Sequence, residues 1–178
     1  FDDVVLNLGP FEQQFREQRQ FFTEGTELFN IGRLFYSRRI GGSPIDQFNV
    51  ESTLSTDEEI IDYPGKVTML NAVKISGRTK GGLGIGFFNA ITEKTEATVE
   101  RTEKTILGLD TITNTSTYKT TVNPFSNYNI LVLDQQFNQN SSVTLINTNV
   151  TRDGRFRDAN VTGLLWHVED KKSTYNVD

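Results

Sequence analysis

Arginine and glutamate side chains crowd a phenylalanine-rich segment between residues 11 and 39, and such groups could bind a ligand. The planar donor fork of arginine suits carboxylate and phosphate oxygens, so the segment predicts contact with an anion or a glycan. The candidate ligand-binding residues are Arg16, Arg19, Glu24, Glu27, Arg38 and Arg39. The same side chains could instead pair with one another in a structural plug, because an unpaired charge is costly where water is excluded. The sequence favours this structural interpretation and leaves the binding one open.

Catalytic chemistry has weaker support in the residue pattern. Glycoside hydrolysis needs two carboxyl groups at a set separation, and Glu24 and Glu27 are the nearest pair in this segment. The chain has 23 acidic residues, so one such pair is expected without any function. His167 is the only histidine and there is no cysteine, which argues against a metal site or a Ser-His triad. We therefore predict no catalytic residue, no metal and no cofactor, and a simple turn at Asp153–Gly154.

Composition narrows the class of protein and its partners. The formal net charge is −5, the pI is about 5.0 and no basic stripe is visible, so nucleic acid is not an expected partner. No run of about 18 apolar residues occurs, which excludes a membrane-spanning helix but leaves spanning strands possible. The chain starts at Phe1 and stops within a further strand-like run, so we expect it to be an internal piece of a longer polypeptide.

Strand-like runs recur from Lys66 onward, with apolar and polar residues in alternation. They cover residues 66–76, 83–93, 126–137, 142–150 and 160–169, and another run begins near Thr174. Their connections alternate in length, with short ones at 77–82, 138–141 and 170–173 and longer ones at 94–125 and 151–159. Outer-membrane barrels join strands of about 9–11 residues by tight periplasmic turns and longer outer loops. The pattern predicts an all-β fold that is part of an antiparallel transmembrane β-barrel. A soluble antiparallel sheet is the alternative.

The chain before Lys66 is less regular. Residues 1–9 could hold a short strand, and Phe11 and Phe15 have the spacing of a helical turn. Residues 34–40 are predicted to be a strand and residues 41–65 a long loop. Residues 94–121 are predicted to be a hydrophilic loop that could extend its flanking strands.

We expect a single domain over residues 1–178. Residues 1–40 would hold an N-terminal strand and a plug-like or periplasmic segment, and residues 66–178 would hold the hairpins. If the short turns are periplasmic, the longer connections and residues 41–65 lie outside, and residues 10–32 lie on the periplasmic side or in the barrel mouth.

Large aromatic side chains of the predicted strands could form a girdle at the membrane interfaces, as in outer-membrane barrels. The predicted interface residues are Phe88, Tyr128, Phe137, Trp166 and Tyr175. Ordinary cross-strand packing is the alternative for them. Three polar residues interrupt the apolar faces and count against lipid contact, namely Lys74, Asn129 and Asn147.

Two paired motifs resemble a known family. They are residues 19–29, Arg-Gln-Phe-Phe-Thr-Glu-Gly-Thr-Glu-Leu-Phe, and residues 34–41, Leu-Phe-Tyr-Ser-Arg-Arg-Ile-Gly. Residues 71–78 and 147–152 are also similar. On these motifs essentially the whole chain resembles a Bacteroidota family named domain of unknown function 5916.

The resemblance implies an outer-membrane β-barrel that usually follows a module similar to carbohydrate-binding family 9. It implies the outer membrane of a Gram-negative bacterium as the location. The implied partners are outer-membrane lipid, other outer-membrane proteins or lipoproteins, and a glycan bound through a module outside this chain. Asp110–Thr111–Ile112 resembles the Asp-Thr-aliphatic O-glycosylation sequence of Bacteroidota, which makes Thr111 a candidate modification site.

The sequence thus predicts a non-enzymatic outer-membrane barrel protein that anchors or cooperates with a glycan-related or envelope-assembly system. Two alternatives remain open. One is a membrane-associated, glycoside-active hydrolase, a label that members of the resembled family often carry. The other is a soluble β-sheet interaction domain.

Overall fold

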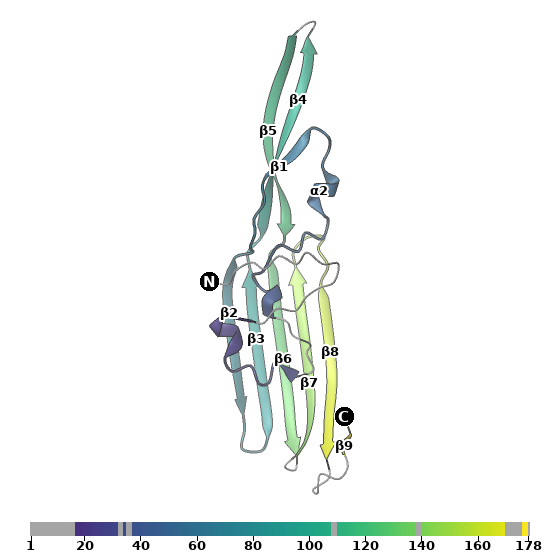
Figure 1. The fold of residues 1–178 in the computed structure, drawn as a ribbon. Helices are drawn as coiled ribbons and strands as arrows, with labels where there is room; N and C mark the ends of the chain where they lie inside the picture. Colours follow the sequence, from purple (N-terminus) through teal and green to yellow (C-terminus); the bar gives the residue numbers. More distant parts are fainter. Residues whose placement is uncertain are drawn as a thin grey trace.

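The computed structural model describes residues 17–31, 34, 37–107, 110–137, 140–169 and 176–177. These residues form two antiparallel sheets, one extending from an end of the other (Figure 1). Among them, no helix has the length and apolar character needed to cross a membrane. The predictions for residues 1–9, Phe11, Phe15, Arg16 and Tyr175 lie outside the described residues.

The large sheet is a meander with the strand order β2-β3-β6-β7-β8-β9. Its strands are β2 (Met69–Arg78), β3 (Leu83–Thr92), β6 (Ser126–Phe137), β7 (Ser141–Arg152), β8 (Ala159–Glu169) and the two-residue β9 (Asn176–Val177). The alternating pattern therefore located these strands, and the predicted run 126–137 coincides with β6. Across the described residues the sheet is open, with β2 at one edge and β9 at the other, and it does not close into a barrel.

The small sheet has the order β1-β4-β5 and projects beyond the large one (Figure 1). It comprises β1 (Glu58–Asp62), β4 (Thr95–Leu107) and β5 (Asp110–Asn123). These strands correct the loop predicted at 41–65, and the stretch 94–121, predicted as a loop that could extend its flanking strands, lies in a separate hairpin. Threonine and valine favour extended backbone, and Ala97 and Val122 are buried against Val50 of the short helix α2 (Val50–Thr53).

The predicted strand at 34–40 was also wrong. Ser37–Arg39 form a 3-10 helix, η2, and Leu34 is outside any strand. The backbone carbonyls of Ser37 and Ile40 accept hydrogen bonds from the Arg19 guanidinium, so they are not available to a neighbouring strand. A second short helix, α1 (Gln20–Thr23), precedes this turn.

The N-terminal segment, residues 17–40, lies across one face of the large sheet, which we call the covered face (Figure 1). Apolar side chains from both sides form this core, namely Phe22, Leu28, Phe29 and Ile40 from the segment and Phe88, Ala90, Ile130, Val132 and Ile146 from the sheet. Glycine permits the close approach, since a Cβ atom on Gly86 would lie 3.2 Å from the Phe29 ring. The opposite side of the sheet is called the open face.

Candidate functional site

Arg19 of the N-terminal segment is fully engaged by its own surroundings. Its guanidinium donates to both carboxylate oxygens of Glu17 at 2.9 Å, and to the carbonyls of Ile40 at 2.6 Å and Ser37 at 2.9 Å. The same group lies 4.1 Å from the centre of the Phe22 ring. Arg19 therefore ties the two ends of the segment together, as the structural interpretation predicts, and Glu17 is the partner that the sequence analysis missed.

The carboxylate of Glu17 is held in its ionised form. Burial by itself raises the pKa of Glu17, but hydrogen bonds from Arg19 and Ser37 outweigh it and lower the pKa to about 2. The Ser37 hydroxyl donates to Oε2 at 2.5 Å. This pair of contacts is charge-assisted and partly shielded from water, which makes it stronger than an exposed ion pair.

Glu24 and Glu27 are exposed at the outer turn of the segment. Glu24 accepts a hydrogen bond from the side chain of Gln20 at 2.8 Å. The Lys74 ammonium of β2 donates to the backbone carbonyls of Phe21 and Glu24. These contacts fasten α1 to the sheet, so Lys74 belongs to the covered face and does not interrupt the open one.

Arg38 and Arg39 line a pocket of about 520 Å³ at the end of the covered face from which the β4–β5 hairpin projects. The third guanidinium in the pocket comes from Arg152, at the end of β7. Apolar and aromatic side chains form much of the remaining wall, including Leu34, Ile40, Tyr128, Ile130, Val150 and Val161. No described lining residue of this pocket is acidic.

Arg152 is the functional candidate that the sequence analysis missed. It pairs with Ser126 in the register of β6 and β7, so it shares the covered face with Val150 and Ile146. Its Nη1 donates to the carbonyl of Arg157, and its backbone amide donates to Asp158 at 2.7 Å. Its Nε atom is buried without a hydrogen-bond partner among the described residues. Strand alternation alone would have placed Arg152 beside Val150 on one face.

A partly buried ion pair closes the opposite end of the covered face. Arg78 Nη2 lies 2.5 Å from Asp134 Oδ2, and the Thr144 hydroxyl donates to Asp134 Oδ1 at 2.7 Å. Arg78 also donates to the carbonyl of Gly82 at 2.9 Å, within the β2–β3 turn. These bonds satisfy both carboxylate oxygens, so the cluster has a structural role.

The open face carries rows of exposed aliphatic side chains. One row joins Ile85, Leu133, Leu145 and Leu164 across four strands. The adjacent row includes Ile75, Phe87 and Leu131. These side chains remain 36–64% exposed. A soluble protein rarely exposes so continuous an apolar surface without a partner or a membrane against it.

A row of asparagines borders these aliphatic rows on the side toward the hairpin. Asn89, Asn129, Asn149 and Asn160 are direct neighbours across β3, β6, β7 and β8. The Asn89 side-chain amide donates to Asn129 at 2.9 Å and to Asn127 at 2.7 Å. On β7 the asparagines extend one row further toward the turn end of the sheet, to Asn147, which pairs with Leu131 of β6. The change from aliphatic side chains to asparagine is thus an oblique boundary that runs across the sheet.

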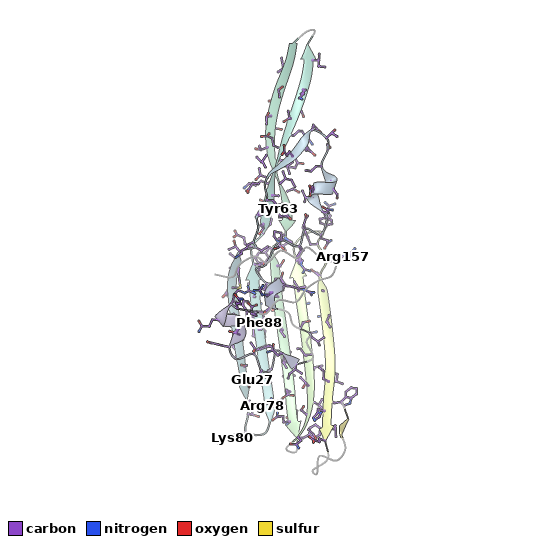
Figure 2. All side chains as sticks on the ribbon, viewed as in Figure 1. Glu27, Tyr63, Arg78, Lys80, Phe88 and Arg157 are labelled. Carbon is purple, nitrogen blue, oxygen red and sulfur yellow. The ribbon has the colours of Figure 1, made fainter. Side chains whose placement is uncertain are left out.

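The aromatic residues predicted to lie at the membrane interfaces are divided between the covered face and the open face of the large sheet. Phe88 is only 1% exposed and packs against Phe21, Phe22 and Phe29 on the covered face, in the middle of the sheet (Figure 2). This position corrects the expectation for Phe88. Tyr128 also faces the covered side and lines the pocket that contains Arg38, Arg39 and Arg152, which we call the arginine pocket.

Phe137 and Trp166 are the two predicted aromatics that are exposed on the open face. They lie toward the turn end of the sheet, since Phe137 ends β6 and Trp166 pairs with Val143 near the start of β7. The Nε2 atom of His167, the residue after Trp166, lies 3.8 Å from Oε2 of Glu169.

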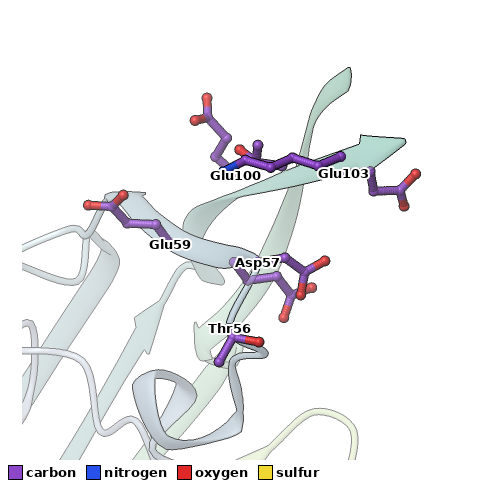
Figure 3. A pocket seen from close by; sticks show the side chains of 8 residues that line it. Thr56, Asp57, Glu59, Glu100 and Glu103 are labelled. Carbon is purple, nitrogen blue, oxygen red and sulfur yellow. The ribbon is translucent and has the colours of Figure 1, made fainter. Parts of the chain in front are cut away.

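The hairpin carries an acidic groove whose carboxylates diverge. Asp57, Glu59, Glu100 and Glu103 point away from one another around it (Figure 3). The remaining one, Glu58, accepts hydrogen bonds from Ser55, Arg101 and Tyr118, which lower its pKa. Within the described ranges, no cluster of His, Cys, Asp or Glu could hold a metal ion.

Two smaller predictions concern turns and modification. Gly154 has a φ of 74°, and the Asp158 carboxylate accepts the Arg152 amide, so Asp153–Gly154 is part of a turn as predicted. The backbone of Thr111 lies near the tip of the projecting hairpin, at the start of β5, and its modification stays a prediction.

Comparison with known proteins identifies a family. The family described as Domain of unknown function (DUF5916) matches residues 1–178. No curated protein and no solved structure matches the chain. The resemblance carried by the paired arginine and phenylalanine motifs is therefore confirmed at the level of the family. The chain belongs to the DUF5916 family.

Proposed function

We propose that this chain is part of an outer-membrane β-barrel protein, non-enzymatic in this region, whose open face contacts lipid acyl chains. The observation that carries the proposal is the boundary between the aliphatic rows and the asparagine row on that face. Lipid accepts leucine readily and excludes amides, so a membrane edge would produce such a boundary.

The arrangement of connections supports an orientation. The β2–β3 and β6–β7 turns lie at one end, and the projecting hairpin and the β7–β8 connection lie at the other (Figure 1). By the rule of short periplasmic turns, the hairpin and the asparagine row face the outside of the cell.

The covered face would then be the inner wall of the barrel. Two ion pairs lie on this face, Arg78 with Asp134 and Arg19 with Glu17. The N-terminal segment would occupy the lumen as a plug, and the open edges of the sheet would be paired by further strands. The protein would anchor or cooperate with a glycan-related or envelope-assembly system through other modules.

Site-directed spin labelling tests the lipid contact directly because the chain has no cysteine. Leu133→Cys and Asn149→Cys place labels on the open face, within the aliphatic row and within the asparagine row. In phospholipid vesicles we expect the Leu133 label to be accessible to oxygen and shielded from a water-soluble nickel chelate. The Asn149 label should show a clear gain in nickel access.

Lys119→Cys, on the exposed hairpin, is the control for full water access. Equal nickel access at Leu133, Asn149 and Lys119, in a protein that stays monomeric without detergent, would overturn the proposal. That result would favour the soluble interaction domain.

A further inference from the structure

The arginine pocket of the covered face is positively charged, although the chain as a whole is negatively charged. Arg38, Arg39 and Arg152 line it, no described lining residue is acidic, and the whole sequence carries a net charge of −5. Three cations in one concave site favour an anion between them, because like charges that approach one another repel.

Arg152 is positioned to receive a ligand. Its guanidinium is fixed at one end by the carbonyl of Arg157, which lies at the hairpin end of the large sheet (Figure 2). Its Nε atom is buried within the protein, so a ligand would contact the part of the Arg152 side chain that lines the pocket.

The surroundings of Arg19 differ from those of the pocket. Arg19, in the same N-terminal segment, donates to Glu17, Ser37 and Ile40 and lies outside the cavity. Arg38, Arg39 and Arg152 line one cavity, whose walls include the apolar parts of Tyr128 and Ile130. A ligand for this site therefore combines an anionic group with an apolar body.

We propose that the pocket binds a phosphate monoester that carries an apolar body. A phosphate monoester has a charge of about −1.5 to −2 at neutral pH and three acceptor oxygens, which suits three guanidinium groups better than a carboxylate does. The volume of about 520 Å³ is typical of sites for small organic ligands. This inference rests on the covered face alone and not on the lipid contact of the open face.

Isothermal titration calorimetry with hexyl phosphate tests the inference, with inorganic phosphate and hexan-1-ol in separate titrations. We expect saturable binding of hexyl phosphate, at least about tenfold tighter than that of either control. A charge-assisted hydrogen bond accounts for a change of about ten- to hundredfold in affinity, so Arg152→Gln and Arg39→Gln should each weaken binding about tenfold or more.

Lys80→Gln is the matched control, since it removes one positive charge from the exposed turn at the other end of the sheet (Figure 2). It should leave the affinity unchanged. Thermal unfolding of each variant verifies folding, and Arg39 is exposed, so its substitution leaves the buried core intact. Phenyl phosphate separates two sources of the ligand. Tighter hexyl binding indicates a lipid-like ester, and tighter phenyl binding indicates a soluble aromatic one.

Three outcomes would overturn the assignment. They are the absence of saturable hexyl phosphate binding, equal affinity for inorganic phosphate or hexan-1-ol, and an affinity that Arg152→Gln and Arg39→Gln leave unchanged. None of them bears on the spin-label test at Leu133, so failure of one proposal is distinguishable from failure of the other.

Discussion

Glu17 controls the docking of the N-terminal segment, because two side chains of that segment donate hydrogen bonds to its ionised carboxylate. Arg19 and Ser37 are those donors, and they are far apart in the chain. The carboxylate thereby joins the start of the segment to η2. Its ionisation state is thus expected to determine how firmly the segment is held against the sheet.

Acidification should loosen this segment. The folded-state pKa of Glu17 is about 2, below the ordinary value of 4.5. Stability from the ionised form is therefore complete above about pH 4.5 and is lost as the pH falls toward 2. Amide hydrogen exchange over residues 17–40, corrected for the intrinsic rate at each pH, should show protection falling across that window.

Glu17→Gln should remove protection of the segment at neutral pH and flatten its dependence on pH below 4.5. Glu27→Gln, on the exposed turn of the same segment, is the control and should behave like the original protein. If Glu17→Gln keeps the full pH dependence, another group is responsible for it.

At the scale of elements, the close approach between the N-terminal segment and β3 depends on glycine. Gly84 and Gly86 face the segment, and Leu28 and Phe29 occupy the space above them. On the open face of the adjacent strand β2, a Cβ atom added to Gly77 would meet no atom within 4 Å. The two faces of one hairpin thus supply a test site and its control.

Gly86→Ala should destabilise the protein by about 1–3 kcal/mol, because the added methyl group would lie 3.2 Å from the Phe29 ring and displace it. Gly77→Ala should be neutral or stabilising by about 0.5–1 kcal/mol, since alanine loses less backbone entropy on folding. Urea titration of both variants measures the free energy of unfolding. Equal destabilisation by the two substitutions would contradict a tight contact at Gly86.

The strands were predictable because alternation is a local signal, whereas their faces were not. On β3, both sides carry apolar residues, with Phe87 on the open face and Phe88 on the covered one. Nothing in the local pattern says which side a distant segment will cover. For the same reason the sequence pointed to Arg38 and Arg39 as candidate residues but not to Arg152. Arg38 and Arg152 line the same pocket only because of tertiary packing.

The β4–β5 hairpin was missed because most of its exposed residues are polar, on both sides. Its few buried positions, such as Ala97 and Val99, are too sparse to give an apolar stripe. A polar, threonine-rich stretch without such a stripe is typical of a loop, although β-branched residues favour strands.

At the scale of the whole molecule, the two faces of the large sheet meet different environments. The covered face is packed and carries the ion pairs Arg19–Glu17 and Arg78–Asp134, and the open face is aliphatic with an amide border. If the open face contacts lipid, the free-energy cost of introducing a charge there should depend on how deeply the position lies in the membrane.

Leu133→Arg should therefore cost about 2–4 kcal/mol of stability in vesicles, whereas Asn149→Arg should cost about 0–1 kcal/mol. Folding into phospholipid vesicles over a urea titration measures both. Leu133 and Asn149 lie on the same face of neighbouring strands, and both substitutions introduce the same charged side chain. Similar costs at the two positions would argue against a depth-dependent environment.

The insertion of the hairpin between β3 and β6 has one more consequence. Thr92 and Ser126 are direct neighbours in the sheet, so the chain leaves and re-enters it at almost the same point. The hairpin, with the α2 region that packs on it, is therefore an exchangeable appendage. Related chains can diversify or shorten it, or graft new sequences onto it, while the meander beneath keeps its registers.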